Sequence, residues 1–362
     1  ISYIGYQTQE VKAARTMKII LKEDSELLQE VVVVGYGTQK KANLTGAVAT
    51  VDVNKTLDSR PIADIGRGLQ GAVAGVNITI PTGEVGSDPL IKIRGQVGSI
   101  SGNNTPLILL DNVEIPSIQM VNPNDVQSIS VLKDAASSSI YGSKAAFGVI
   151  LITTKSGAQS DKFEVSYSNN FSWQDPAKKI EIGGIEALQY TLDAQTNRRE
   201  PMPAGGFWRI SPESLEKAIE WQNLYGGKVK WNDPVVYGRD WFYDGKDKYG
   251  YRLYDGAKAM IKNWTPTMTH NLSVNGKSGK TSYNIGLGYL DQSGMSKTAK
   301  KDDFKRYNAS VSVTSEINKY ITVRASSIYS DRNKRYPGIG NTTADPWLYL
   351  YRWSPLMPMG VT

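Results

Sequence analysis

Three short stretches have the residue types of nucleotide-binding loops. GKS at 276–278 and GKT at 279–281 are near-matches to a phosphate loop, and GYGTQK at 35–40 is part of a dinucleotide fingerprint. The first two lack the glycine required about five positions before the second glycine, and the third lacks its last glycine and opens no helix. Phosphate chemistry is therefore not supported, and we interpret residues 276–281 as a hairpin turn.

Metal and acid–base chemistry also lack the necessary residues. The sequence has no cysteine and one histidine, His270, which excludes disulfides, thiolate sites and histidine clusters. His270 has no partners for a triad and lies in a strand-like run, so we expect it in an aromatic belt or facing a lumen. DGKDKYG at 244–250 lacks the spacing of a calcium loop and is interpreted as a solvated turn. We expect no enzyme, no cofactor and no metal site.

The run QEVVVVGYGTQKK at 29–41 offers backbone edges instead of reactive side chains. Four buried valines could contribute roughly 6 to 12 kcal/mol, which favours a core strand. The run is short, however, and Gly35 and Gly37 would weaken a central strand where it should continue. A buried strand and a peptide handed to another protein both fit these residues.

Aromatic residues are dense between 208 and 254. Such density suggests stacking on sugar rings or contact with a partner protein, and the candidate contacts are Trp231, Trp241, Tyr243 and Tyr251. Packing of this segment against itself, or a position at lipid headgroups, explains the same residues.

Composition limits the class of protein. The chain has 362 residues and a net charge of +7, and its 42 basic residues are scattered, which argues against nucleic-acid binding. There is no apolar run of about 18 residues, as a transmembrane helix requires. A membrane β-barrel is compatible with this composition, because its strands carry only alternating hydrophobicity. The opening ISYIGYQTQEV resembles the middle of a strand, so we expect a processed or truncated edge without a signal peptide.

The chain divides into three segments with different sequence patterns. Residues 1–28 suit the last hairpin of a small β-sandwich, and 46–157 predict a small α+β domain. In that domain we expect helices in PIADIGRGLQGAVAGV, opening at Pro61, and in KDAASSSIYGSKAAFG, where Gly142 is a plausible terminator. The runs NITI, LIKIRG, PLILLD and GVILITTK predict strands.

From residue 158 onward the pattern has a period of two. DKFEVSYSNNFSWQ, TSYNIGLGYL, RYNASVSV and YITVRASSIY alternate apolar residues with Ser, Asn, Gly or charge. A soluble sandwich has the same period, but aromatic residues near strand ends favour a lipid-facing outside and a wet inside. We count at most five such strands before residue 331.

Loop lengths alternate between short and long. Residues 277–280 and 318–319 are tight turns, whereas 292–303, 331 onward and 175–266 are longer. Because outer-membrane barrels keep short turns periplasmic, we expect 175–266 to form a large extracellular loop. A helix is predicted there in SPESLEKAIEWQNLYGG, with Ser211 as N-cap and Pro212 at the first position.

Several runs together carry a resemblance to a known family: QEVVVVGYGTQKKANLTGAV, LQGAVAGV, IRG, PLILLDNVEI, NPNDVQSISVLKDAASSSIYGSKAAFGVILITTKSG, THNLSVNG and SYNIGLGYLDQSG. The chain resembles the N-terminal portion of SusC-type TonB-dependent outer-membrane transporters, the SusC/RagA family. The match is dense over 30–157, patchier over 264–330 and weak in the long loop. LLDNVEI departs from the Asp-Gly usual in the family, but Asn112 can still occupy a left-handed turn.

The resemblance implies an α+β plug domain inside a transmembrane antiparallel β-barrel, of which only the first strands are present, preceded by the end of a small β-sandwich domain. Residues 1–28 would be the tail of a carboxypeptidase-regulatory-like domain, and 29–45 the TonB box and linker. The plug would occupy 46–157, and 158–362 would be the N-terminal part of the barrel.

The resemblance also singles out individual residues. The TonB box would comprise Glu30, Val31, Val32, Val33, Val34, Gly35, Tyr36 and Gly37. The plug motifs carried over are Leu69, Gln70, Gly71, Gly75, Arg94, Gly95, Asp111, Pro123, Asn124, Asp125, Tyr141 and Gly142. Arg94 is a candidate for a charged contact between plug and barrel wall, although a solvated arginine at a strand end fits equally well.

The function that this resemblance implies is TonB-dependent import of oligosaccharides across the outer membrane, with a SusD-like lipoprotein as a lid. Oligopeptide import, a TonB-dependent signal transducer and a siderophore or cobalamin receptor are the alternatives, and a structural adhesin would need no TonB box. The implied partners are TonB with ExbB and ExbD, outer-membrane lipid and lipopolysaccharide; a dimer of SusC–SusD pairs is one assembly that fits.

We expect a multi-pass β-barrel in the outer membrane of a Gram-negative bacterium, with the TonB box facing the periplasm. TonB would pair the valine segment with its own sheet edge. We expect the Gly35-Tyr36-Gly37 ending and the pair Lys40-Lys41 to limit self-pairing of an exposed valine edge.

Overall fold

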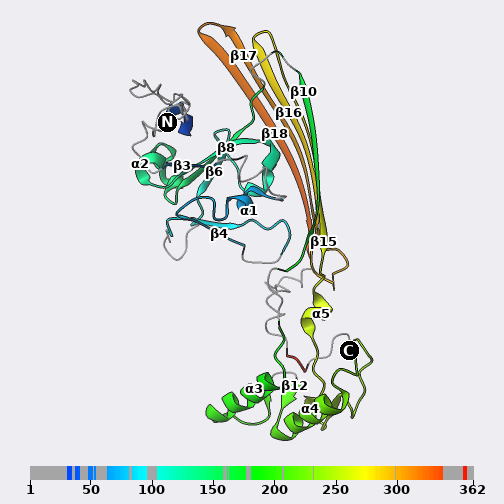
Figure 1. Ribbon diagram of the computed structural model, residues 1–362. Coiled ribbons are helices and arrows are strands. Elements are labelled where there is room, and N and C mark those ends of the chain that lie inside the picture. Colours follow the sequence, from blue (N-terminus) through cyan, green and yellow to red (C-terminus); the bar gives the residue numbers. More distant parts are fainter. Residues whose placement is uncertain are drawn as a thin grey trace, which may run out of the picture.

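The structure is a computed structural model of all 362 residues. The residues that it describes are 31–34, 37–40, 48–51, 53, 63–80, 84–95, 104–157, 161, 163–176, 181–205, 208–230, 232–297, 299–336 and 354–356. A mixed α+β domain lies against one face of a long antiparallel sheet, and a third unit lies beyond one end of that sheet (Figure 1). The predicted β-sandwich tail at 1–28 lies outside the described residues.

The mixed domain is built on a five-stranded sheet with the order β3-β8-β9-β6-β7, in which β6 and β9 are parallel and the other pairs antiparallel. Its core contains fully buried Ile65, Ile129 and Ile150. A separate hairpin joins β4 and β5. The strands are β3 (Val48–Val51), β4 (Val76–Thr79), β5 (Leu90–Ile93), β6 (Leu107–Leu110), β7 (Val113–Glu114), β8 (Val126–Leu132) and β9 (Val149–Thr154).

Strand β8 lies between β3 and β9 but was not among the strands expected from the sequence. Its run VQSISVL contains Gln127, Ser128 and Ser130, which interrupt the apolar pattern. Ser130 is nevertheless buried, at a position where it pairs with Thr50 of β3 on one edge and Leu151 of β9 on the other. The four strands predicted from apolar runs are confirmed as β4, β5, β6 and β9.

The helices of the mixed domain are shorter than predicted. Helix α1 (Ile65–Leu69) begins after the N-cap Asp64, not at Pro61. The Asp64 side chain accepts a hydrogen bond from Arg67 N. Gly142 interrupts the second helical segment, as expected: α2 (Ala135–Ser138) continues into η5 (Ser139–Ala145), but Gly142 has the non-helical angles φ 68° and ψ −156° and separates two helical turns there. Two further 3₁₀ turns are η3 (Ile118–Met120) and η4 (Pro123–Asp125).

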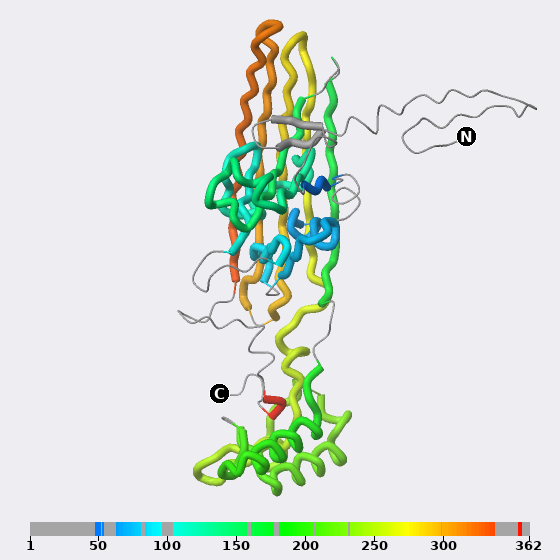
Figure 2. The backbone as a smooth tube through the Cα atoms, turned by 90° about the vertical axis from the view of Figure 1, so that its left-hand side faces the viewer, coloured from blue at the N-terminus to red at the C-terminus, as the bar shows by residue number. Residues whose placement is uncertain are grey.

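The long sheet has the strand order β10-β15-β16-β17-β18 and curves around one side of the mixed domain (Figures 1 and 2). The predicted five strands and their tight connections are confirmed, with turns at Gly279–Lys280 and Lys319–Tyr320. The strands are β10 (Glu164–Gln174), β15 (Thr265–Ser278), β16 (Thr281–Ser293), β17 (Asp303–Asn318) and β18 (Ile321–Arg335).

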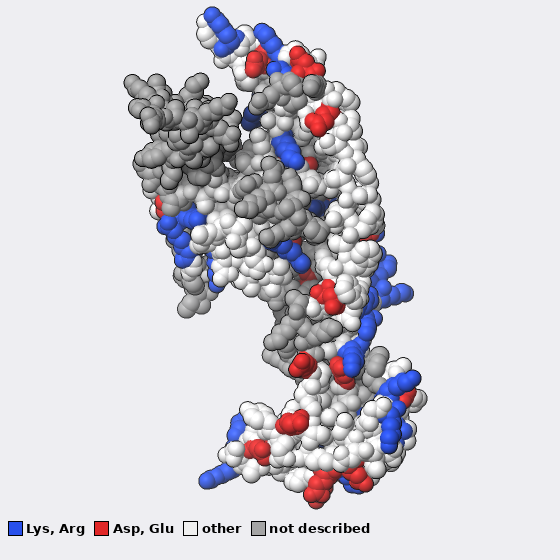
Figure 3. Space-filling view, viewed as in Figure 1, with Lys and Arg blue, Asp and Glu red and all other residues white. Residues whose placement is uncertain are grey.

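The two faces of the long sheet differ in character. On the outer face, apolar residues stand in register across the strands, as in the row Val165, Val274, Ile285 and Val311. Val165 is 53% exposed. In Figure 3 the outer edge of the sheet carries few charges over its middle, and charges gather toward its two ends. None of the described helices has the length and hydropathy needed to cross a membrane.

The third unit, which we call the loop unit, connects β10 to β15. Helix α4 (Pro212–Tyr225) is confirmed with Ser211 as N-cap and a full capping box. Helix α3 (Ile185–Asn197) was not predicted, because its N-cap is Gly184 and no side chain caps it. The helices pack on a four-stranded sheet of β11 (Ala204–Gly205), β12 (Trp208–Ile210), β14 (Lys248–Gly250) and β13 (Trp241–Tyr243), and α5 (Gly256–Met260) leads back to β15.

The core of the loop unit includes a residue from far along the chain. Leu356 is 1% exposed and packs with Leu188, Ile210 and Leu215. Nearby, Tyr254 N donates to the carbonyl of Pro355 at 2.7 Å. The segment 354–356, which follows β18, is therefore part of the unit inserted between β10 and β15.

The valine run forms β1 (Val31–Val34), which pairs with β2 (Gly37–Lys40) in an antiparallel hairpin. That the glycines and lysines limit self-pairing of an exposed valine edge stays a prediction, because this hairpin pairs the valines with the segment that follows them. Gly37 and Lys40 themselves stand opposite Val34 and Val31. Glu30, Gly35 and Tyr36 lie outside the described residues.

We predict that Leu356→Ala destabilises the loop unit by about 2–5 kcal/mol, because it leaves a cavity in a closed core. Leu224→Ala on α4 is the matched control, since Leu224 is 50% exposed. Thermal unfolding of the full-length protein in detergent, followed by tryptophan fluorescence, measures the difference. Equal melting of both variants would contradict the packing of Leu356.

Candidate functional site

The mixed domain is bound to the long sheet by alternate residues of β17. Arg306 Nη1 donates to Gln119 O at 3.0 Å, and Asn308 Nδ2 donates to Met120 O at 2.8 Å. Ser310 Oγ donates to Asp125 Oδ2 at 2.9 Å. Residues two apart on a strand share one face, so β17 presents this polar row to η3 and η4 of the mixed domain.

Strand β18 adds basic residues to the same interface. Arg332 lies directly opposite Arg306, and its Nη1 donates to Ser117 Oγ at 2.6 Å. Lys334 donates to Ser87 Oγ at 3.1 Å and forms an ion pair with Glu84. Two like charges directly opposite each other are unfavourable in a sheet. Acidic residues of the mixed domain offset this repulsion, and we call Arg306, Arg332 and Lys334 the basic latch.

Glycines in β16 allow the mixed domain to approach the sheet. A Cβ on Gly286 would lie 2.6 Å from Asp125 Oδ1, and a Cβ on Gly288 would lie 2.6 Å from Asn122 Nδ2. Asn122 Nδ2 also donates to Asn271 Oδ1 of β15 at 3.0 Å. Any larger side chain at either glycine would therefore meet η4 or its cap.

Asp125 is a buried carboxyl at the centre of this interface. Burial raises its pKa, while the hydrogen bond from Ser310 and the charges of Lys155 and Arg306 lower it by less. The pKa of Asp125 is therefore raised above its ordinary value. Burial therefore disfavours the ionised carboxylate of Asp125, although Ser310, Lys155 and Arg306 would each stabilise that form.

A polar cavity of about 730 Å³ lies between the mixed domain and strands β10, β15, β16 and β17 of the long sheet. Asparagine and serine side chains dominate its lining on both sides. From the mixed domain come Asn122, Asn124, Gln127 and Lys155, and from the sheet Ser166, Ser168, Asn170, Asn271, Ser273 and Asn284.

The residues singled out by the resemblance serve mainly the backbone of the mixed domain. Asp111 accepts hydrogen bonds from Thr154 N and Oγ1 at 2.9 and 2.5 Å, which ties the β6–β7 turn to β9. Asn112 occupies a left-handed conformation with φ 69°, as expected. Gln70 Nε2 donates to Ile78 O, and Leu69 is in the core. Positive φ angles occur at Gly71, Gly75, Gly95 and Gly142.

Three of these residues form η4 and one packs elsewhere. Pro123, Asn124 and Asp125 make up the turn that faces the sheet, capped by Asn122, whose side chain accepts from Asn124 N. Tyr141 packs against the small cluster around Leu132.

Within the described residues, Arg94 forms no ion pair with the long sheet, and its position fits the alternative of a solvated arginine at a strand end. Arg94 is exposed in a left-handed turn after β5, where its N donates to Gly75 O at 2.7 Å. The cations of the interface come instead from the sheet, as the basic latch. The alternation in RYNASVSV showed which residues share a face, but not that Arg306 and Asn308 would meet another domain.

His270 lies on the outer face of the long sheet, in a row of aromatic rings. Its Nδ1 is 2.7 Å from the Tyr167 hydroxyl, and its ring stacks on Tyr289 and meets the edge of Phe171. Tyr289 in turn contacts Tyr307, so the row crosses β10, β15, β16 and β17. Of the two expected positions, the aromatic row on the outer face is the observed one.

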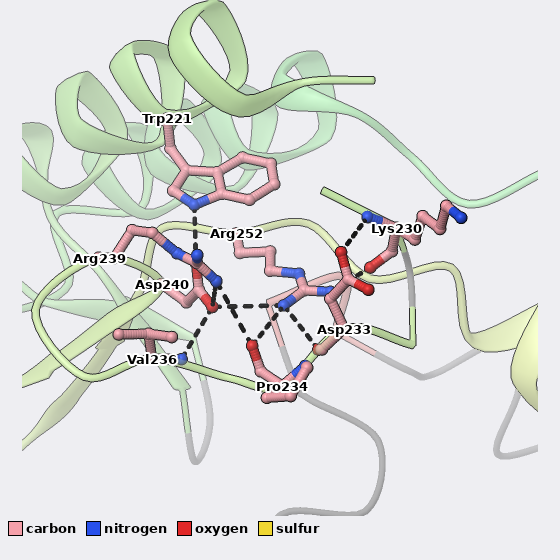
Figure 4. A network of polar contacts seen from close by, with 8 residues as sticks. All are labelled: Trp221, Lys230, Asp233, Pro234, Val236, Arg239, Asp240 and Arg252. Carbon is pink, nitrogen blue, oxygen red and sulfur yellow. Dashed lines mark hydrogen bonds and ion pairs between the residues drawn. The ribbon is translucent and has the colours of Figure 1, made fainter. Parts of the chain in front are cut away.

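The loop unit is organised by a buried carboxylate, Asp240 (Figure 4). Its oxygens accept hydrogen bonds from Trp221 Nε1 at 2.9 Å and from Arg239 Nε at 2.7 Å, and Arg252 Nη1 lies 3.3 Å away. Arg252, only 1% exposed, also donates to Lys230 O at 2.6 Å. Burial would raise the pKa of Asp240, but these donors and Val236 N lower it to about 2.

The four candidate aromatic contacts do not form one site. Tyr251 is buried, with Lys217 Nζ 5.7 Å from its ring centre, so it is not available to a partner in this arrangement. Tyr243 is exposed, and Trp241 packs edge-on against Trp208 and Tyr237. Trp231 lies outside the described residues. Residues 244–247 form the turn between β13 and β14, whereas 248–250 belong to β14. The described residues include no cluster suited to a metal ion.

Comparisons with known proteins agree with this arrangement. Residues 40–149 match the TonB-dependent receptor plug domain. The chain is 30% identical over 322 residues to the TonB-dependent receptor SusC of Bacteroides thetaiotaomicron, covering 86% of this chain and 27% of that protein. It is 31% identical over 352 residues to the TonB-dependent receptor P26 of Formosa agariphila, covering 95% and 31%.

Among solved structures, the RagAB peptide importer in its open-open state is similar, with a TM-score of 0.62 and 29% identity. The alignment covers 85% of this chain and 33% of that one. The chain thus spans about a third or less of the length of these relatives.

We predict that Gly286→Val lowers the melting temperature of the full-length protein, because overpacking against Asp125 and Ser310 costs about 1–3 kcal/mol. Leu287→Val is the matched control, since Leu287 is the next residue and faces outward with 49% exposure. Limited proteolysis of the mixed domain reports whether its seating is disturbed. Equal protection of both variants would contradict the close approach at Gly286.

Acid should loosen the loop unit through Asp240. Its pKa in the folded protein, about 2, is below the ordinary 3.8, so its stabilising effect is complete above about pH 4 and declines as pH falls toward 2. Asp240→Asn should cost about 3–5 kcal/mol at neutral pH, because it leaves Arg252 buried without its counter-charge. Tryptophan fluorescence during acid titration measures both effects. The exposed Asp193→Asn should behave as wild type, and an unchanged acid transition in Asp240→Asn would contradict the assignment.

Proposed function

Because the chain belongs to the SusC-type TonB-dependent receptors, we propose that it supplies the plug and the first wall strands of a transporter that imports oligosaccharides across the outer membrane. From here the mixed domain is called the plug and the long sheet the wall. The single observation that carries the proposal is the way the plug is seated. Hydrogen bonds from inward-facing residues of β17 and β18 hold it, while the outward face of the same strands exposes apolar side chains.

A sheet with one apolar face and one polar face suits a wall between lipid and a polar interior. Outer-membrane barrels place apolar residues toward lipid and polar residues toward the lumen, with short turns on the periplasmic side. We therefore place the turns at Gly279–Lys280 and Lys319–Tyr320 in the periplasm, the loop unit outside the cell, and outer-membrane lipid and lipopolysaccharide against the aromatic row.

TonB is the proposed energy-coupling partner, with ExbB and ExbD. Glu30–Gly37 is the proposed TonB box, and β1 is the strand that TonB would pair with through backbone hydrogen bonds. Since β2 occupies one edge of β1, TonB would either add to the other edge or displace β2. Displacement would involve only four ladder positions, which makes the hairpin a weak competitor.

The loop unit is the proposed docking surface for a SusD-like lipoprotein lid. It exposes Tyr237, Phe242 and Tyr243 beside Trp241, and aromatic rings of this kind can stack on sugars or anchor a protein partner. A dimer of transporter–lid pairs would be compatible with this arrangement.

Oligopeptide import is the second candidate, because the RagAB structure is that of a peptide importer. The name of SusC itself does not specify a ligand class, and exposed aromatic rings favour neither class alone. Isolating the full-length protein with its lipoprotein and identifying bound oligomers by mass spectrometry distinguishes the two. Recovery of peptides without glycans would reverse our ranking, and recovery of an iron chelate would favour the receptor alternatives.

We predict that deleting residues 30–37 abolishes uptake of the co-purified oligomers by cells but leaves their binding and the assembly of the protein unchanged. The reason is that the deletion removes the strand with which TonB would pair. Uptake of radiolabelled oligomer and its binding at 4 °C measure the two effects separately. Uptake at the wild-type rate would refute a TonB-driven transporter.

A sharper variant keeps the length of the segment. Val32→Pro and Val33→Pro each remove one backbone donor, and neighbouring donors point to opposite edges of a strand. At least one of the two should reduce uptake tenfold or more, whereas Val32→Thr and Val33→Thr keep every backbone donor and should not. Full uptake by both proline variants would exclude strand pairing as the mode of coupling.

A further inference from the structure

The plug is held unevenly by the five wall strands. On β17 and β18, Arg306, Asn308, Ser310, Arg332 and Lys334 all donate to plug residues. The latch also lies near carboxylates of the plug: Lys334 pairs with Glu84, and Ser117 Oγ bridges Arg332 to Asp88 Oδ1 at 2.5 Å. Charge-assisted hydrogen bonds of this kind are stronger than neutral ones.

Along β10 and β15 the 730 Å³ cavity separates much of the plug from the wall, and it extends to Arg306 and Asn308 of β17. Strand β16 lines the cavity but also approaches the plug, at Gly286 and Gly288 and through the packing of Leu290. Among the described residues on this side, Asn122 and Asn271 form a neutral hydrogen bond, and a Cβ on Gly157 would lie 2.2 Å from Tyr283 N. None of these contacts is an ion pair, so this side should separate before the latch does.

The cavity is elongated along the strands. On β15 it extends from Thr269 to Asn275, and on β10 from Asn170 to Ser166, which pair in register. The six residue steps from Thr269 to Asn275 correspond to ~20 Å. The cavity therefore follows the direction in which a transported chain would have to travel from the loop unit toward the short turns.

The lining suits a neutral, hydrogen-bonding oligomer. Amide and hydroxyl side chains both donate and accept, and those of Asn271, Asn284 and Ser168 come from three different strands. The charged groups of the lining are Asp125, Lys155 and Arg306, of both signs. Among the described residues, Arg306 Nε is buried without an acceptor, which leaves one donor available when the plug moves.

From this asymmetry we propose that the plug pivots on the basic latch and that the oligomer passes along β10, β15 and β16, through the polar cavity. The inference rests on the proposed import function and adds to it the side of the wall that the passage follows. The shared chemistry of the cargo is a neutral chain rich in hydroxyl or amide groups, which includes both glycans and peptides.

Covalent bridges test which side must open. The 362 residues contain no cysteine, so pairs can be introduced after replacing any cysteine elsewhere in the full-length protein. Asn122→Cys with Asn271→Cys bridges the cavity side, and Ser87→Cys with Lys334→Cys bridges the latch side. Both pairs replace existing hydrogen-bonded neighbours, and each is joined by a bifunctional thiosulfonate of matched length.

The readout is ionic current through the full-length protein in planar lipid bilayers, with urea on the short-turn side to loosen the plug. It needs neither cargo nor TonB, so it can fail independently of the proposed function. The cavity-side bridge should reduce the urea-induced current at least tenfold, and the latch-side bridge should change it less than twofold. Reduction with dithiothreitol should restore the current, which shows that the variants are folded.

The reverse pattern, equal effects of both bridges, or the absence of urea-induced current in every variant would overturn the pivot. A second arm tests the chemistry with two probes, maltoheptaose and a neutral heptapeptide of Gly, Ser and Asn. Both should block the current, and Asn284→Leu with Ser168→Leu should weaken the block at least fivefold. An unchanged block in that double variant would overturn the passage along β10, β15 and β16, and blockade by one probe alone would narrow the cargo to that class.

Discussion

The arrangement of the plug depends on one constraint, the period of two along β17. Arg306, Asn308 and Ser310 can all reach the plug because alternate residues of a strand share a face. Shifting the register of this strand by one residue would turn Tyr307 and Val311 inward and remove all three donors at once. The pairing of β17 with β16 and β18 therefore determines the seating of the plug as well as the shape of the wall.

The same alternation makes the two environments interdependent. The outward residues of β16 and β17 are apolar and exposed, whereas their inward neighbours include Gly286 and Gly288, which admit the plug to van der Waals distance. A strand with small inward-facing residues forms fewer side-chain contacts within its own sheet. The plug supplies those contacts instead, so wall and plug each complete the packing of the other.

Much of this could be predicted from particular residues, and the rest could not for physical reasons. The alternation in β10 and β17 predicted strands with two unlike faces, and Ser211 with Pro212 predicted α4. Central strand β8 was missed because Gln127, Ser128 and Ser130 interrupt its apolar pattern, and local periodicity does not reveal the strands that bury Ser130. The basic latch was missed because Arg306 looks in the sequence like any other residue on the polar face of a strand. Arg94, which belongs to a family motif, was the more visible arginine. Only the tertiary structure shows which of the two arginines lies between the mixed domain and the sheet.

The burial of Leu356 in the loop unit has a consequence for the order in which the protein assembles. Leu356 follows Gly250, which it covers, by 106 residues (356 minus 250), and all of β15 to β18 lies between them. The loop unit cannot close its core until those four strands have been synthesised and their hairpins have brought the chain back to the same end. Because contacts of such long sequence separation form late, the unit should remain open to chaperones and proteases during biogenesis. Its closure would then mark molecules whose first strands have paired correctly.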